Sequence, residues 1–236
     1  MNRKKIIFFT GAGISKESGI DTFRDKGGLW DTYKVEDVAT ITGWKRNPKK
    51  VIDFYNIRRK ELNGVEPNLA HKYVAFLEKE YDVTIITQNV DDLHEKAGST
   101  NIVHLHGKLT ELRSEKNPSI TQEWKEELKY GDTGPDGHQL RPNVVWFGED
   151  LNHTDLNKAY SAAYTADICV IVGTSMQVYP ACEIPFQTKE NCLIYYIDPS
   201  DMDFEIPTYR LPNFKHIKDG AVKGMKQFVK NELPKL

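Results

Sequence analysis

Short apolar runs rich in β-branched residues recur along the chain, and polar stretches with helical spacing separate them. Runs of this length, bounded by glycine or polar residues, are typical of strands that are buried on both faces. The predicted strands are residues 6–10, 83–87, 102–104, 143–146, 168–172 and 193–197.

Four segments have the 3.6-residue spacing of amphipathic helices. The first begins at Asn47-Pro48, where an N-cap residue precedes a proline at the first helical position. Arg58 and the apolar residues that follow Pro48 fall on one side of this helix. The apolar residues are Val51, Phe54, Tyr55 and Leu62. The other predicted helices are residues 68–79, 154–166 and 220–233.

Strands that alternate with helices predict an α/β fold with a Rossmann-like, doubly wound parallel sheet. In such a sheet, ligands bind outside the carboxyl ends of the strands. Residues 11–13, 87–89 and 173–175 all lie at or just after the ends of predicted strands. We therefore expect these three turns to share one site.

Two stretches interrupt the alternation of strands and helices. Residues 27–67 are loop plus helix, and residues 114–141 are polar, rich in turns and poor in apolar side chains. We expect them to be two insertions that form a small helical and loop lobe, at about 27–67 and 113–141. The large lobe would then comprise about 1–26, 68–112 and 142–236 of a single domain.

Charge and composition exclude several classes of partner. The chain has 32 basic and 34 acidic residues, so no overall field favours nucleic acid or a membrane surface. The first apolar run has only four residues before a glycine turn, too few for a signal peptide, and no later run could span a bilayer. Cys169, Cys182 and Cys192 lack metal-site spacing and suggest buried thiols in a reducing compartment. We expect a soluble, cytoplasmic monomer.

The turn Gly11-Ala12-Gly13 is the first candidate for a nucleotide site. Glycines leave room for a diphosphate, and the N–H groups of a following helix could accept its charge. However, Lys16 stands where the third glycine of GxGxxG would be, and an ordinary strand–helix turn has the same sequence. These residues alone support a nucleotide site and a plain turn equally.

Five motifs resemble those of the sirtuins, the NAD-dependent protein lysine deacylases. They are GAGIS-x-x-SGI-x-TFR at 11–24, TQNVDDLH at 87–94, LHG at 105–107, LRPNVVWFGE at 140–149 and VGTS-x-x-VYPA at 172–181. The resemblance covers nearly the whole chain and implies the fold described above. Within the family, the chain looks most similar to the bacterial enzymes and the desuccinylase branch.

The resemblance implies a set of NAD-binding residues at the ends of the strands. Amide and carboxylate side chains can hydrogen-bond ribose hydroxyls and the nicotinamide carboxamide. Thr22 replaces an aspartate that is common in the family, and Asp198 replaces a frequent asparagine, so the contacts at these two positions are open. The implied set is Gly11, Ala12, Gly13, Thr22, Phe23, Arg24, Gln88, Asn89, Asp91, Gly173, Thr174, Ser175, Asp198 and Ala221.

The implied reaction releases nicotinamide and gives O-acyl-ADP-ribose, and it needs a base that works near neutral pH. An imidazole, with an ordinary pKa of about 6.5, suits this task. His106, in the family's His-Gly motif, is expected to be the base, and Asn89 a second catalytic residue. His104 is expected to be structural.

The resemblance also implies the substrate-binding residues. Val145, Phe147, Gly148 and Glu149 correspond to the segment on which the substrate backbone lies as an added strand. Tyr55 and Arg58, three residues apart on the predicted helix, correspond to a pair that takes the carboxylate of succinyl- or malonyl-lysine. The small Ala39 leaves room for a longer acyl chain. We expect acetyl and acidic acyl groups to be accepted, although Tyr and Arg at this spacing are common on ordinary helices.

Most sirtuins bind a structural zinc ion through two cysteine pairs in the small lobe. Residues 113–141 of this chain contain no cysteine, so a Cys₄ site is impossible there. The acidic residues and His138 of the GDTGPDGH stretch suggest a solvated Gly/Pro turn rather than a metal loop. We expect a zinc-free lobe held by Trp124, Leu128 and Tyr130 on a short helix.

Two other functions remain as alternatives. One is protein mono-ADP-ribosyl transfer. The presence of His106 and of the Gln88-Asn89 pair argues against it, because that chemistry has less need of a base. The other is a non-catalytic NAD or ADP-ribose binding module, which does not require the complete set Phe23, Asn89, Asp91 and His106. A Rossmann dehydrogenase is disfavoured because the third glycine is absent and no acidic residue is clearly placed for the ribose.

Overall fold

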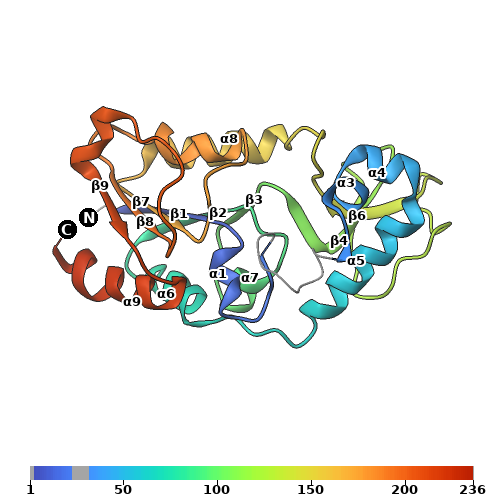
Figure 1. The fold of residues 1–236 in the computed structure, drawn as a ribbon, viewed down its shortest axis with the longest axis horizontal. Coiled ribbons are helices and arrows are strands. Elements are labelled where there is room, and N and C mark those ends of the chain that lie inside the picture. Colours follow the sequence, from blue (N-terminus) through green and yellow to red (C-terminus); the bar gives the residue numbers. More distant parts are fainter. Residues whose placement is uncertain (1–2, 23–31, 236) are drawn as a thin grey trace.

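Six parallel strands form the main sheet of the computed structural model, which describes residues 3–22 and 32–235 (Figure 1). The strand order is β3-β2-β1-β7-β8-β9. The chain builds the sheet outward from β1 on one side and from β7 on the other, so the switch point of the doubly wound fold lies between these two strands. The Rossmann-like α/β prediction is confirmed. The strands are β1 Lys5–Thr10, β2 Asp82–Thr87, β3 Ile102–His104, β7 Ile168–Val172, β8 Leu193–Ile197 and β9 Phe214–Ile217.

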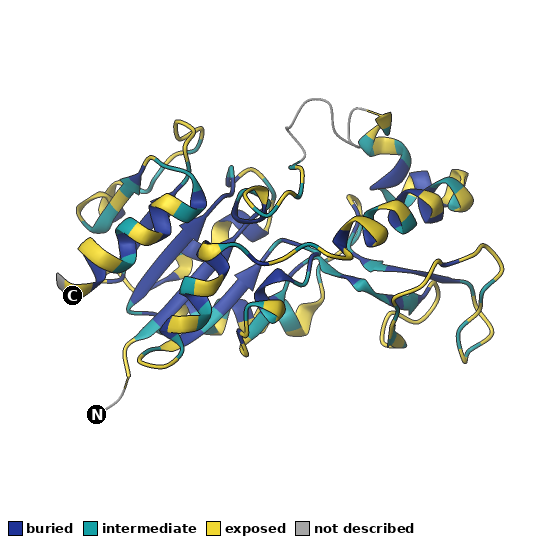
Figure 2. Cartoon of the chain, turned by 90° about the horizontal axis from the view of Figure 1, so that it is seen from below, coloured by how far each residue is buried: buried dark blue, intermediate teal, exposed yellow. Residues whose placement is uncertain are grey.

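The central strands are apolar throughout because both faces of the sheet are covered. Successive side chains of β1 enter different apolar clusters: Ile6 and Phe8 pack with α6 and α9, and Ile7 and Phe9 pack with α8. Figure 1 shows α8 on one side of the sheet and α6 and α9 on the other, and Figure 2 shows the buried strands between helices with exposed outer faces. These helices are α6 Leu69–Leu77, α8 His153–Thr165 and α9 Ala221–Gln227.

The remaining strands form a separate antiparallel sheet in the order β5-β4-β6. Three helices share one apolar cluster with this sheet. We call these elements the small lobe, and the six-stranded sheet with its helices the large lobe. The small lobe contains α3 Val35–Val38, α4 Ile41–Arg46, α5 Pro48–Leu62, β4 Gly107–Ser114, β5 Thr121–Glu123 and β6 Leu140–Val144.

Two predictions about this region are wrong. The apolar run at 143–146 predicts a strand of the parallel sheet, but it overlaps β6, which pairs antiparallel with β4. Residues 124–130 are loop rather than helix. Leu128 is buried in the small-lobe cluster and Trp124 packs against it, but Tyr130 is 63% exposed and does not hold the lobe.

Helix starts follow their capping residues. The Asn47 side chain accepts a hydrogen bond from the Lys50 amide, and Pro48 is the first helical residue, as predicted. Asn68 and Asn152 cap α6 and α8 in the same way. The predicted last helix is α9 continued by the π turn Phe228–Glu232 and the 3₁₀ turn Leu233–Lys235.

Several helices of four to seven residues are missing from the prediction because they are too short to show a helical period. All three cysteines are buried and free, as expected. Within the described residues, no helix has both the length and the apolar composition needed to cross a bilayer. The short helices are α1 Gly13–Lys16, α7 Leu93–Lys96, η1 Ala181–Gln187 and η2 Thr208–Asn213.

Candidate active site

A cavity of about 580 Å³ opens at the carboxyl ends of β1, β2, β7 and β8. Residues of the large lobe line one wall, and Tyr55, Arg58 and residues 144–149 of the small-lobe side line the other. The cavity therefore lies at the switch point of the sheet, where doubly wound folds bind ligands, and its size suits an extended small molecule.

The turns after β1 and β7 touch each other at the floor of this cavity. Gly13 N donates to the Gly173 carbonyl at 2.8 Å, and Gly11 N donates to the Val172 carbonyl at 3.0 Å. A Cβ on Gly13 would lie 2.6 Å from Gly173 Cα, and one on Gly11 would lie 2.6 Å from Thr174 Cβ. The two glycines are thus required for packing between the turns, and their amides are already paired with the neighbouring turn.

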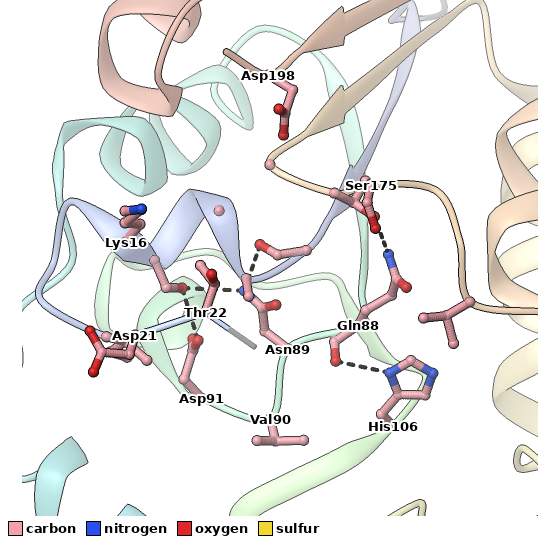
Figure 3. A pocket seen from close by; sticks show the side chains of 18 of the residues that line it. Lys16, Asp21, Thr22, Gln88, Asn89, Val90, Asp91, His106, Ser175 and Asp198 are labelled. Atoms are coloured by element: carbon pink, nitrogen blue, oxygen red, sulfur yellow. Dashed lines mark hydrogen bonds between the residues drawn. The ribbon is translucent and has the colours of Figure 1, made fainter. Parts of the chain in front are cut away.

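Asn89 and Asp91 follow β2 and are joined through Ser15 of α1 (Figure 3). Ser15 Oγ donates to Asp91 Oδ2 at 2.8 Å. Asn89 Nδ2 donates to Ser15 Oγ at 3.2 Å and to the Gly11 carbonyl at 3.1 Å. Burial raises the pKa of Asp91, and hydrogen bonds from Ser15 and the Leu93 amide oppose this effect. Ser15, to which the sequence analysis gives no role, is the residue that fixes both site side chains.

His106 has one ring nitrogen committed and one available. Nδ1 lies 3.0 Å from the Gln88 carbonyl, which can only accept, so Nδ1 carries the hydrogen and Nε2 has the lone pair. Burial lowers the pKa of His106, and the bond to Gln88 opposes this effect. The Gln88 side chain in turn donates to Thr174 Oγ1 at 3.0 Å. His106 is therefore a neutral imidazole at neutral pH, with a basic nitrogen beside the cavity that it lines.

His104, two residues earlier, is engaged on both nitrogens. Nδ1 lies 3.2 Å from the Asn89 carbonyl, and Nε2 lies 2.8 Å from Glu95 Oε1. Burial alone would raise the pKa of Glu95, but the hydrogen bond and charge of His104, with Lys108, lower it to about 2. His104 ties β3 to α7 and to the Asn89 turn, which fits the structural role expected for it.

Tyr55 and Arg58 both line the cavity from α5. Trp146 Nε1 donates to Tyr55 Oη at 2.9 Å, and burial raises the pKa of Tyr55 to about 12, so its hydroxyl stays neutral. Arg58 Nε lies 3.7 Å from Glu61 Oε2, and its side chain is 14% exposed. Ala39 lines the same cavity. The wall thus presents a hydroxyl and a guanidinium around a space that a larger residue at 39 would reduce.

Val145, Phe147, Gly148 and Glu149 line the cavity after β6. The main chain of Phe147 is already paired, because its N–H donates to the Ala39 carbonyl at 3.0 Å and its carbonyl accepts from Ile41 N at 3.3 Å. At Phe147 one side of the segment is therefore already paired, and the Phe147 ring is 53% exposed.

The Glu149 carboxylate is paired with side chains and main chain of the small-lobe side. Its carboxylate accepts from Arg141 at 2.6 and 2.9 Å, from Arg113 at 3.0 Å and from the Trp146 amide at 2.9 Å. These bonds fold the carboxylate back into the small lobe, so its part in the site is to anchor the segment 145–149.

Thr22, Asp198 and Ala221 also line the cavity, and Figure 3 shows Thr22 near Asn89. Asp198 Oδ1 accepts from the Ser200 amide at 2.9 Å, and Figure 3 places Asp198 and His106 at opposite ends of the view. Phe23 and Arg24 lie outside the described residues. Every other predicted cofactor, catalytic and substrate residue borders this one cavity.

No cluster of three or more potential metal ligands occurs among residues 3–22 and 32–235. In the turn at 131–138, Asp136 accepts hydrogen bonds from the Ser114 hydroxyl and the His138 amide, and Asp132 accepts from the Lys129 amide. These carboxylates stabilise the turn itself, in line with a Gly/Pro turn.

Comparisons with known proteins identify relatives over the whole chain. Residues 11–180 match the Sir2 family. A Helicobacter pylori protein named NAD-dependent protein deacylase is 48% identical over 233 residues, which cover 99% of this chain and 95% of that protein. A Bacteroides thetaiotaomicron protein of the same name is 46% identical over 237 residues, covering 98% and 99%.

Solved structures agree with these relatives. The structure of a Sir2 homologue–NAD complex superposes with a TM-score of 0.84 at 36% identity, covering 97% of this chain and 89% of that chain. A Sir2 homologue–ADP-ribose complex gives a TM-score of 0.85 at 36% identity, covering 97% and 91%. From its sequence, its fold and the residues around its cavity, the chain belongs to the Sir2 family.

Proposed function

We propose that this chain removes acyl groups from protein lysines in an NAD-dependent reaction that gives nicotinamide and O-acyl-ADP-ribose. The observation that carries this proposal is the state of His106. Its Nδ1 is committed to the Gln88 carbonyl, so its basic Nε2 is available in the cavity that Asn89 and Asp91 also line. Relatives named NAD-dependent protein deacylase support the same reaction.

The residues of the cavity suit NAD. Carboxylates, amides and hydroxyls at Asp198, Asn89, Asp91 and Ser175 provide acceptors and donors for ribose hydroxyls and phosphates along one cavity. When bound, NAD supplies an electrophilic ribose carbon and a leaving group, nicotinamide. Asn89 and Asp91 are held in place by Ser15 before the ligand arrives, so little ordering is left for the binding step.

His106 handles the proton, and Asp91 positions its neighbours. His106 Nε2 takes the proton from the hydroxyl that attacks the acyl group, and the Gln88 carbonyl stabilises the imidazolium through Nδ1–H. The lowered pKa of His106 keeps this base unprotonated at neutral pH. Asp91, buried after β2, orients Ser15 and through it Asn89.

We further propose that acidic acyl groups, succinyl and malonyl, are accepted together with acetyl, as in the desuccinylase branch. Arg58 and the neutral hydroxyl of Tyr55 line the wall at which an acyl chain would end. The small side chain of Ala39, on the same cavity, leaves space for a longer acyl chain. A hydrogen bond to a charged partner contributes about 1.5–3 kcal/mol, roughly one to two decades of selectivity.

The test is product analysis by mass spectrometry with one peptide that bears acetyl-, succinyl- or unmodified lysine. We expect NAD-dependent loss of acyl groups with matching O-acyl-ADP-ribose, and a loss of about 10²–10⁴-fold in rate in His106→Ala. Arg58→Met should lower desuccinylation about tenfold or more and spare deacetylation. An equal loss of both activities would refute the acyl-pocket assignment.

The same assay separates the alternatives. A peptide that gains ADP-ribose without losing its acyl group would indicate mono-ADP-ribosyl transfer. Binding of NAD without release of nicotinamide would indicate a sensing module.

We also infer a single catalytic domain that acts on proteins in the cytoplasm, as a monomer, without zinc and without nucleic acid or membrane partners. Three buried thiols and a near-balanced charge support this setting. Strand pairing favours drawing the lobe boundary so that β4 and residues 140–149 join the small lobe, rather than ending that lobe at 141.

A further inference from the structure

A chain of buried polar groups runs behind Asn89, away from the cavity. The Asn89 amide donates to Thr87 Oγ1 at 3.0 Å, and Thr87 Oγ1 lies 2.9 Å from Thr10 Oγ1. Thr10 Oγ1 lies 3.1 Å from His94 Nε2. Both threonines are fully buried and His94 is 2% exposed. None of these three is among the described residues that line the cavity.

A second histidine extends this chain toward α6. The rings of His71 and His94 pack edge to face, with centroids 5.0 Å apart, and His71 is fully buried. His71 Nδ1 lies 3.2 Å from Asn68 Oδ1. The Asn68 amide has a fixed orientation, because Oδ1 accepts from Ala70 N and Nδ2 donates to the Ile14 carbonyl. His71 Nδ1 therefore carries the hydrogen, and His71 Nε2 carries a lone pair.

Two ring nitrogens, His94 Nδ1 and His71 Nε2, are buried without a hydrogen-bond partner in the part of the chain that the structure describes. Buried polar atoms are rarely left unpaired, because desolvation is then uncompensated. The directions of the hydrogen bonds between Thr87, Thr10 and His94 decide which nitrogen of His94 carries a hydrogen. Thr10 donates its hydroxyl hydrogen to Thr87 and therefore accepts a hydrogen bond from His94 Nε2. His94 Nδ1 then holds a lone pair, as His71 Nε2 does, so the two rings meet through edge-to-face packing.

We propose that His94 and His71 are positioning residues for Asn89. Hydrogen bonds lead from His94 through Thr10 and Thr87 to the main chain of Asn89, and the His71 ring packs against His94 and is held by Asn68 on α6. Ser15 and the Gly11 carbonyl hold the side chain of Asn89. Both halves of Asn89 are thus fixed before a ligand binds, which preserves reactive geometry. The inference rests on the proposed function only in taking Asn89 as part of the catalytic site.

The two anchors of Asn89 also meet at Asn68. Its amide nitrogen holds the Ile14 carbonyl of α1, the helix that carries Ser15, and its amide oxygen holds His71. Asn68, at the start of α6, therefore helps to position both the main chain and the side chain of Asn89. Loosening either histidine should move the Asn89 turn without opening the sheet.

Matched variants separate this role from general packing. Glutamine at position 94 can place an amide nitrogen near the position of Nε2 and keep the bond to Thr10, whereas leucine of similar size cannot. Thr87→Val keeps the shape but removes the oxygen that accepts the Asn89 amide. If His94→Leu fails to fold, Thr87→Val carries the test alone.

The measurements are steady-state kinetics with an acetyl-lysine peptide and amide hydrogen exchange of the ligand-free chain. In His94→Leu and Thr87→Val, kcat should fall about tenfold or more, with KM for the peptide changed less than about threefold. Exchange at residues 88–91 should accelerate about tenfold, while exchange at 82–86 of β2 stays as in the wild type. His94→Gln should keep kcat within about threefold of the wild type.

Three outcomes would overturn the proposal: unchanged kcat in both variants, exchange that rises equally through β2, or a glutamine variant as impaired as the leucine variant. A wild-type chain that releases no nicotinamide would refute the proposed function instead. The exchange experiment needs no turnover, so it still decides whether the histidines hold the Asn89 turn.

Discussion

The two lobes differ in what they bury beside their apolar side chains. Behind the site, the large lobe buries neutral groups: threonines, Asn89, and the histidines His71 and His94, whose pKa values burial lowers. The small lobe buries two arginines, Arg59 and Arg141, at 3% and 2% exposure. The large lobe has one comparable arginine, Arg210, which holds main-chain carbonyls near η1. Permanent charge thus lies close to the small-lobe cluster, and titratable neutral groups lie close to the site.

Arg141 shows how charge can hold a small core together. Its guanidinium donates to Glu149 and to the Val144 carbonyl, and lies 3.3 Å from the centre of the Trp146 ring. Trp44 of α4 lies on a further side, 5.9 Å away. One side chain therefore joins β6, the segment 145–149 and α4.

Arg59 does the same for α5. Its Nε donates to the Leu109 carbonyl at 3.1 Å, and Nη1 donates to Asn56 Oδ1 at 2.9 Å. Asn56 pairs with both main-chain groups of Leu128, at 2.8 and 2.9 Å. These two neighbours attach α5 to β4 and to the loop at 124–130, the region in which most sirtuins have zinc ligands. The small lobe thus combines a small apolar core with buried arginines that hydrogen-bond to its main chain and side chains.

The largest expected effect is that of Arg141→Met. The change leaves Glu149 partly buried without its main partner, and breaking a buried ion pair costs about 3–5 kcal/mol. The three described tryptophans, Trp44, Trp124 and Trp146, all pack in the small-lobe cluster, so fluorescence follows this lobe while far-UV circular dichroism follows the whole chain. In urea, the fluorescence transition of Arg141→Met should move to lower concentration and precede the dichroism transition.

Arg113→Met is the matched control, because Arg113 bonds the same carboxylate through one hydrogen bond and is 13% exposed. Its effect should be smaller than that of Arg141→Met. Coincident transitions in the Arg141 variant would mean that the two lobes unfold as one unit. The lobes would then differ in how their side chains pack but not in their stability.

Acid should weaken the large lobe first. Burial lowers the pKa of His71 to about 4, from an ordinary value of 6.5. The unfolded chain then binds protons that the folded chain does not, so stability falls as the pH drops from 6.5 to 4, by on the order of 3 kcal/mol. Burial favours a raised pKa for Glu149, but the hydrogen bonds and charge of Arg141 lower it, so this carboxylate resists protonation as the pH falls.

The measurement is urea unfolding at several pH values between 6.5 and 4, followed by both probes. The dichroism midpoint should fall more steeply than the fluorescence midpoint, and His71→Gln should flatten the dependence. A slope that is identical in the wild type and in this variant would contradict the buried neutral state of His71.

The sequence predicts the large lobe well because a sheet buried on both faces leaves continuous apolar runs. Strands 102–104, 168–172 and 193–197 are confirmed to the residue, and α5 begins at its predicted cap. The cavity residues could be predicted from the sequence because they follow strand ends and match family motifs. The buried arginines of the small lobe could not be predicted, since a buried charged residue looks like a surface residue in a hydrophobic pattern. The main-chain partner of Arg59, the Leu109 carbonyl, also lies 50 residues away in sequence.

Ser15, Thr10 and His94 were missed for a related reason. Each acts through a hydrogen bond to a residue more than 70 positions away. Single polar residues at the end of a strand or in a short helix have no pattern that separates them from capping residues. The polar layer behind the site is visible only when the strands are placed side by side.

A smaller effect is expected for Arg59→Met. The change removes hydrogen bonds to a buried main-chain carbonyl and to Asn56, and leaving such acceptors unpaired costs about 1–3 kcal/mol. Lys60→Met, at the exposed neighbouring position of α5, should stay within about 0.5 kcal/mol of the wild type. Equal effects of the two changes on the urea midpoint by fluorescence would show that the Arg59 bonds do not support the lobe.

The smallest expected effect is that of a chelator. The cysteine-free stretch 113–141 cannot form a Cys₄ site, and the groups that join this region to α5 are protein atoms: Arg59, Asn56 and Leu128. Because a structural zinc ion contributes folding free energy directly, removing one would unfold the lobe that it holds. Dialysis against a strong chelator should therefore leave the fluorescence-detected thermal midpoint within about 1 °C of its untreated value. Two results would contradict this prediction: stoichiometric zinc by atomic emission, or a lower midpoint after dialysis that added zinc restores. Either result would show that a metal site stabilises the small lobe and that its buried arginines do not replace zinc.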